Sequence, residues 1–105
     1  SDEAAEWEGW QLKAQYVAER LQGIDGVKVK IEDDPAERQG PQPVLYFEDE
    51  FDGPTISEIK ERLENGDPAI FVGGGSERAE INIVMVNVQD GEEIVIADRM
   101  NEILR

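Results

Sequence analysis

An apolar seam in the first quarter of the chain constrains its fold more than any other feature. Its members recur at alternating spacings of three and four positions: Trp7, Trp10, Ala14, Val17, Leu21 and Ile24. This spacing places them on one face of a helix, with Asp2 expected as its N-cap and Gly23 and Gly26 around its end. Because tryptophan carries a large apolar area, the rest of the chain must provide a surface on which this helix packs.

Two strands are predicted after this helix. Val27, Val29 and Ile31 alternate with two lysines, which is typical of a half-buried strand. Residues 32–42 hold acids, prolines and a glycine and are predicted to be a loop, and residues 44–47 form a second short apolar run. Both apolar segments are therefore expected in one sheet.

The second half of the chain begins with a helix and a hairpin. Thr55-Ile56-Ser57-Glu58 is a capping box, and Asn65-Gly66 ends the helix that it opens. Residues 69–72 and 81–88 are predicted as the third and fourth strands. Residues 73–78 are a glycine-rich flexible connection, so the two strands are expected to pair as a hairpin.

A closing helix completes the chain. Asp90-Gly91-Glu92-Glu93 is predicted to be a second capping box, and Ile96, Met100 and Ile103 follow on one stripe. The order is α-β-β-α-β-β-α within a single α+β domain, residues 1–105. The natural solution for this order is a mainly antiparallel sheet of about four strands with the helices packed on one face.

Charge and composition exclude several classes of function. Ten lysines and arginines against 25 aspartates and glutamates give a net charge of −15, which repels nucleic acid and anionic membrane surfaces. The acidity indicates solubility or adaptation to salt, with an acidic face for a basic partner as the alternative. No apolar run approaches the roughly 18 residues of a membrane span. Without cysteine or a targeting leader, a cytoplasmic chain is expected, and the missing initiator Met suggests processing or a fragment.

The chain lacks the usual reactive groups. It has no histidine and no cysteine, so neither Ser-His-Asp nor Cys-His catalysis can be built. Glu48, Glu50 and Asp52 resemble a calcium loop, but Ile59 occupies the position that requires a bidentate glutamate, and a solvated turn is preferred. Lys28, Lys30 and Lys60 lie in polar or charged stretches and are expected to be exposed rather than desolvated for Schiff-base formation. We therefore assign no catalytic, cofactor-binding or metal-binding residue.

Two candidate sites remain. The candidate ligand-facing loop consists of Gly73, Gly74, Gly75, Ser76 and Arg78. A phosphate-binding loop would continue with Lys-Ser or Lys-Thr and a helix, so a hairpin connection is preferred, with Arg78 placed to meet a carboxylate or phosphate or to remain a surface arginine. The candidate interface consists of Trp7, Trp10, Ala14 and Val17. Aromatic residues at helical spacing favour packing in the core or in a partner groove over a ligand site.

Several stretches resemble the small C-terminal domain of fold-type I pyridoxal-phosphate (PLP) enzymes. The similarity is to the group of bacterial selenocysteine synthase and D-glucosaminate-6-phosphate ammonia lyase. The stretches that carry it are Glu6-Trp7-Glu8, Ala18-Glu19-Arg20-Leu21, Ile24-Asp25-Gly26-Val27, Thr55 to Leu63, Asn65-Gly66-Asp67-Pro68-Ala69-Ile70-Phe71, and Asp90-Gly91-Glu92-Glu93 to Leu104. They cover nearly the whole chain, and they are short and mostly structural.

The resemblance implies an architecture rather than a reaction for this chain. In such enzymes the large domain holds PLP on a Schiff-base lysine, and the small domain closes over the active site. Nothing here matches the lysine motif, so PLP is implied only for a parent enzyme, with a PLP-binding large domain or a homo-oligomer partner. The group carries arginines after its third strand and near the end of its fourth, where this chain has Gly73 and Asn87.

Three functional hypotheses follow. The first is the small domain of a PLP-dependent lyase or transferase-like enzyme, which contributes interface and active-site closure but no catalysis alone. The second is a free-standing acidic binding or assembly module that uses the Trp7/Trp10 seam. The third is a small enzyme built on carboxylates, in which paired acids act as acid and base.

Overall fold

The computed structural model describes residues 2–34, 36 and 39–105. Three helices and four strands follow the predicted order: α1 (Asp2–Arg20), β1 (Val27–Glu32), β2 (Gln42–Phe47), α2 (Ile56–Glu64), β3 (Gly73–Gly75), β4 (Glu80–Asn82) and α3 (Glu92–Leu104). The strands form one antiparallel sheet in the order β1-β2-β4-β3. The predicted α+β fold is therefore confirmed. Part of the predicted loop 32–42 lies outside the described residues.

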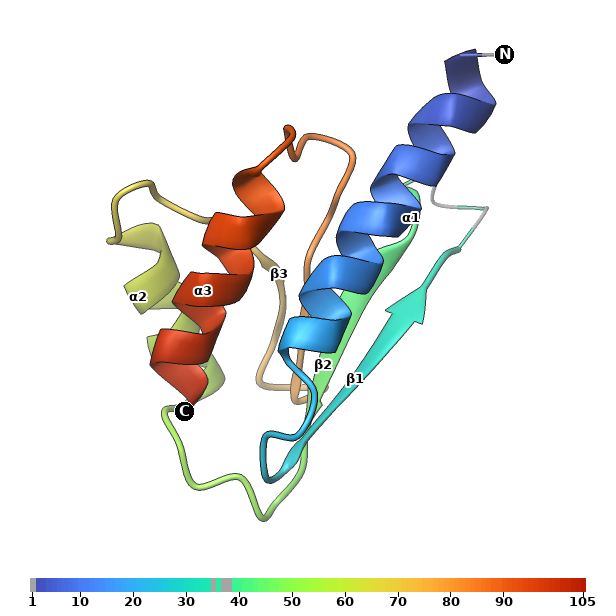
Figure 1. Ribbon diagram of the computed structural model, residues 1–105. Coiled ribbons are helices and arrows are strands. Elements are labelled where there is room, and N and C mark those ends of the chain that lie inside the picture. Colours follow the sequence, from blue (N-terminus) through green and yellow to red (C-terminus); the bar gives the residue numbers. More distant parts are fainter. Residues whose placement is uncertain (1, 35, 37–38) are drawn as a thin grey trace.

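The helices form a layer beside the sheet. In Figure 1, α3 lies between α1 and α2, and α1 lies in front of β2. α1 and α3 run in the same direction. Two ion pairs show this: Lys13 pairs with Asp90 at 3.0 Å, and Arg20 pairs with Asp98 at 2.6 Å. No helix in the described part of the chain is long and apolar enough to cross a membrane.

The core lies between this helical layer and one face of the sheet. The predicted seam supplies much of it, since Ala14, Val17 and Leu21 are completely buried. Leu45 of β2 and Ile81 of β4 are opposite each other in the ladder and are also completely buried. The other face of β1 is polar, with Lys28 and Lys30 exposed as predicted.

The third and fourth strands are not where they were predicted. β3 is the glycine run Gly73–Gly75 rather than residues 69–72, and β4 is Glu80–Asn82 rather than residues 81–88. Glycine suits the centre of this strand because β4 approaches it closely: a Cβ on Gly74 would lie 2.2 Å from the Glu80 carbonyl oxygen. The hairpin itself is confirmed. The apolar runs on either side of it lie outside the two observed strands.

The helix starts differ in their caps. Thr55 accepts from the Glu58 N–H at 3.1 Å and its own N–H donates to the Glu58 side chain at 3.3 Å, which confirms the first capping box. The second box was wrong, because Gly91 is the N-cap of α3 with φ +93° and Asp90 pairs with Lys13 instead. Asp2 lies within the first turn of α1 and is not its N-cap.

Candidate functional site

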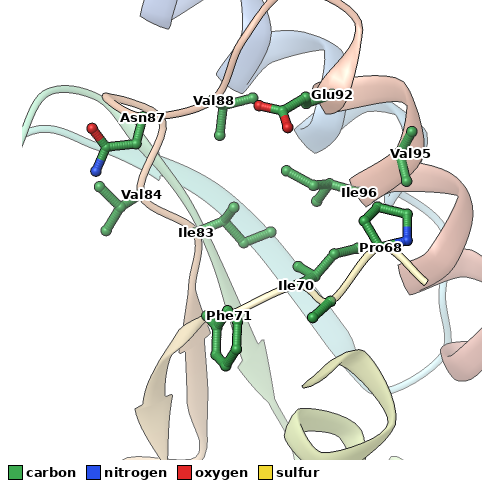
Figure 2. A pocket seen from close by; sticks show the side chains of 11 residues that line it. Pro68, Ile70, Phe71, Ile83, Val84, Asn87, Val88, Glu92, Val95 and Ile96 are labelled. Atoms are coloured by element: carbon green, nitrogen blue, oxygen red, sulfur yellow. The ribbon is translucent and has the colours of Figure 1, made fainter. Parts of the chain in front are cut away.

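An apolar groove opens where the β3–β4 hairpin meets α3. It has a volume of about 420 Å³, which falls in the range of small-molecule sites, roughly 300–1,000 Å³. Three segments line it, namely residues 68–71 before β3, residues 83–88 after β4, and the first turns of α3. Figure 2 shows Ile70, Ile83 and Ile96 converging across its centre. We call this hollow the groove.

The segment before β3 is fixed by hydrogen bonds from both neighbouring helices. The guanidinium of Arg99 on α3 donates to the carbonyl oxygens of Asp67 at 2.9 Å and Pro68 at 3.2 Å. The Ile70 N–H donates to the carbonyl oxygen of Leu63 on α2 at 2.9 Å. Ile70 is consequently held in the floor, whereas Phe71 is 75% exposed at the mouth of the groove.

The segment after β4 is fixed from the other side by α1. Lys13 Nζ donates to the Val88 carbonyl oxygen at 2.8 Å and pairs with Asp90 at 3.0 Å. The Lys13 side chain is only 15% exposed, whereas Asp90 is fully exposed. An ion pair with an exposed carboxylate contributes little. The hydrogen bond from Lys13 to the Val88 carbonyl oxygen therefore does more to hold this segment in place.

The groove suits an uncharged, apolar group rather than an anion. Glu92 is the one charged residue among those that line it, and its carboxylate accepts from the Gln89 N–H at 2.6 Å. Glu93 accepts from the Gly91 N–H at 2.7 Å. At the start of α3, where an anion would bind, the Glu92 and Ile94 N–H groups donate to the Gln89 and Gly91 carbonyl oxygens, and the two carboxylates add negative charge beside them.

The candidate ligand-facing loop is divided between a strand and a turn. Gly73, Gly74 and Gly75 form β3, and Ser76 and Arg78 lie in the turn that follows. The Arg78 side chain is 86% exposed and lies 3.9 Å from Glu80. The groove adjoins the open end of this hairpin and the turn forms its closed end, so the structure does not bring Arg78 to the groove.

The candidate interface is divided in a similar way. Ala14 and Val17 are completely buried within this domain, and Trp10 is half-buried against the core. Trp7 keeps 44% of its surface exposed, and its indole N–H donates to Asp33 at 3.0 Å. Only the N-terminal turns of α1 therefore present part of the seam to solvent, where they extend beyond the sheet in Figure 1.

The chain's lysines do not fit a cofactor site. Lys28 pairs with Glu48 at 3.5 Å, Lys60 donates to the Gly74 carbonyl oxygen at 2.9 Å, and Lys30 lies over the Tyr46 ring. With Lys13 held by Val88, no lysine of the described chain points an amine into the groove. The described residues also contain no cluster of three side chains able to hold a metal ion. PLP has no point of attachment here.

Tyr46 is the most perturbed titratable group of the polar sheet face. Its hydroxyl donates to Glu32, and this bond, together with burial, raises the pKa of Tyr46 to about 12. Because the folded state favours the neutral phenol, the resulting stability is fully present below pH 10.0 and is lost as pH rises through about 12.

Replacing Glu32 with glutamine should lower the pKa of Tyr46 toward 10.0, because the charged acceptor that stabilises the phenol is removed. The measurement is phenolate absorbance in a Tyr16→Phe background, in which Tyr46 is the remaining tyrosine. An unchanged titration curve would show that Glu32 does not hold the phenol.

Sequence reasoning did not identify the groove. Its residues come from segments far apart in the chain, and the apolar stretches that form its walls were interpreted as strands. One signal was available, namely the two positions at which the resembled group carries an arginine and this chain does not. Asn87 lines the groove, and Gly73 begins β3 two residues after Phe71. The two departures from the group's pattern are thus both near this hollow.

Comparisons with known proteins support the resemblance at the level of structure. No protein-family model and no curated protein matches the chain. Its structure is similar to the solved structure of D-glucosaminate-6-phosphate ammonia-lyase, with a TM-score of 0.71, 26% sequence identity and 86% of this chain covered. The match covers 25% of the ammonia-lyase chain, so this chain corresponds to about a quarter of the length of that protein. The predicted resemblance is confirmed.

Proposed function

We propose that this chain is the small C-terminal domain of a PLP-dependent lyase or transferase-like enzyme. The observation that carries the proposal is the structural likeness over 86% of the chain to a quarter of an ammonia-lyase. A complementary observation is that the described residues offer no lysine to a cofactor in the groove. In this proposal a separate large domain carries out the chemistry. This chain contributes an interface with that domain and closes the active site.

The groove is the surface that faces the active site in this proposal. Asn87 and Gly73 occupy the places where the resembled group carries arginines, and both lie at or beside the groove. With an amide and a glycine there, and with Glu92 engaged by the backbone, the described residues that line the groove offer no cation to a substrate phosphate or carboxylate. Its contribution is to exclude water from the site with an apolar wall that includes Ile70, Ile83 and Phe71.

The exposed turns at the start of α1 are the second contact with the large domain. Trp7 and Leu12 remain 44% and 61% exposed, an unusual apolar area for an isolated helix end. In the resembled enzymes this helix links the two domains and packs between them. Packing against a large domain would bury both side chains.

The test is an absorbance titration with PLP of the chain alone and of the chain joined to the large domain encoded beside it. We expect no Schiff-base band from the chain alone, and a Schiff-base band with turnover from the two-domain protein. A bound-PLP spectrum from this chain alone would contradict the proposal. So would a neighbouring coding sequence that lacks a segment with a lysine-bearing PLP motif.

A free-standing acidic binding or assembly module is the second candidate, and the exposed Trp7 favours it. Under this reading the first turns of α1 bind a different partner, and the groove has no part in catalysis. The neighbouring coding sequence distinguishes the candidates, because only the first requires an adjoining PLP-binding domain.

A further inference from the structure

The outer edge of β1 is open, and its backbone groups are arranged to pair with another strand. β1 has β2 as its one neighbour in the sheet formed by the described residues. The Phe47 N–H donates to Ala79 and the Pro43 carbonyl accepts from Ile83, so odd-numbered residues of β2 bond away from β1. In antiparallel register the even residues of β1 then bond to β2. The N–H and C=O groups of Val29 and Ile31 therefore point to the open edge.

The side chains on the polar face of this strand have a charge order that is complementary to itself. Reading along that face, the residues are Lys28, Lys30 and Glu32. In an antiparallel pair of two copies centred on Ile31, Lys30 falls opposite Glu32. This pair occurs twice because the arrangement is two-fold symmetric.

Neighbouring registers lack this complementarity. Centring the pair on Lys30 places Lys30 against its own copy, and centring it on Val29 places Lys28 against Lys30 twice. Like charges directly opposite one another destabilise a ladder, whereas opposite charges stabilise it. Of the three registers, only the one centred on Ile31 brings no lysine against a lysine.

We propose that a second copy of this chain pairs with β1 through the edge centred on Ile31, which joins the two sheets into one. Within the chain, Lys30 lies over the Tyr46 ring and Glu32 accepts from the Tyr46 hydroxyl. Neither forms an ion pair with another described residue, so both charges can still pair with opposite charges of the second copy.

This interface is separate from the groove. β1 is one edge of the sheet, while the groove lies beside β3 and β4 at the other. Pairing through β1 therefore leaves both grooves open. The inference does not depend on the proposed enzymatic role, and its failure would leave that role intact.

The experiment is sedimentation velocity of the full chain from dilute to concentrated solution, in enough salt to screen the repulsion between two chains of net charge −15. We expect a reversible monomer–dimer equilibrium. Lys30→Glu and Glu32→Lys should each weaken dimerisation by about tenfold or more, because both symmetric pairs become repulsive. The double variant Lys30→Glu/Glu32→Lys restores opposite charges and should return the dimer to within about threefold of the parent.

Arg62→Glu is the matched control for Lys30→Glu, because it makes the same change of charge at an exposed position of α2 and should leave dimerisation unchanged. Circular dichroism of each variant checks that the monomer is folded. A chain that stays monomeric at every concentration would overturn the proposal. A double variant as weak as either single variant would also overturn it, since the defect would then not arise from pairing of these charges.

Discussion

Replacing Gly26 with alanine should lower the free energy of unfolding by about 3 kcal/mol, whereas the same change at Gly23 should cost about 1 kcal/mol. Both glycines have positive φ, +80° and +81°, so the alanine methyl group meets the same backbone strain at each position. The surroundings differ. A Cβ on Gly26 would lie 2.5 Å from the backbone of Phe51, while a Cβ on Gly23 meets nothing within 4 Å.

The clash at Gly26 is costly because hydrogen bonding and packing hold the turn that contains Phe51 in place. The Gly26 carbonyl oxygen accepts from the Glu48 N–H at 2.8 Å, and the Phe51 ring packs edge-on against Phe47 with a centroid distance of 5.1 Å. Moving residue 51 away would disturb both contacts. Denaturant unfolding of the two variants measures the difference, and equal losses of stability would show that the turn around Phe51 yields freely.

The sequence was sufficient to predict the element order because each helix and the first two strands carry their own periodicity. The Trp7-to-Ile24 spacing and the Thr55 capping box are local signals, and both correspond to observed structure. The alternation of Val27, Val29 and Ile31 likewise matches β1. Local patterns of this kind require no knowledge of what lies across the core.

The pairing of the third and fourth strands could be predicted, but their bounds could not. The bounds depend on contacts between backbone segments that are separated in the sequence. Apolar residues at 69–72 and 81–88 satisfy a strand pattern, yet most of them pack around the groove. In the observed strand, a Cβ on Gly73 would lie 2.6 Å from the Asn82 side chain and a Cβ on Gly74 would lie 2.2 Å from the Glu80 carbonyl oxygen. A run of glycines gives no periodic signal. The strand bounds therefore depend on a close approach that composition does not reveal.

The groove was beyond prediction for a related reason. Its shape depends on Arg99 holding Pro68 and on Lys13 holding Val88, and each contact joins residues more than thirty positions apart. Neither residue has a sequence context that indicates its partner. The candidate loop, by contrast, was selected from a local run of glycines and the candidate interface from local helical spacing.

Filling the groove should have the largest effect on function if this domain closes an active site. Ala69 is exposed and lines the groove, so Ala69→Trp would occupy part of its volume without displacing a buried side chain. In the complete two-domain enzyme we expect kcat/KM to fall by about a hundredfold, because misplacement of the closing wall by about 1 Å is enough for a loss of that size. Stability should change by less than about 0.5 kcal/mol, as is usual for an exposed position.

Ser57→Trp is the control for this experiment, since it adds the same indole at an exposed position near the start of α2, away from the residues that line the groove. It should leave kcat/KM unchanged. Steady-state kinetics of both variants, with thermal unfolding to confirm that each is folded, separate a blocked groove from a damaged domain. Full activity in Ala69→Trp would mean that the groove faces away from the reacting substrate, and the closure role would then have to pass to another surface of the domain.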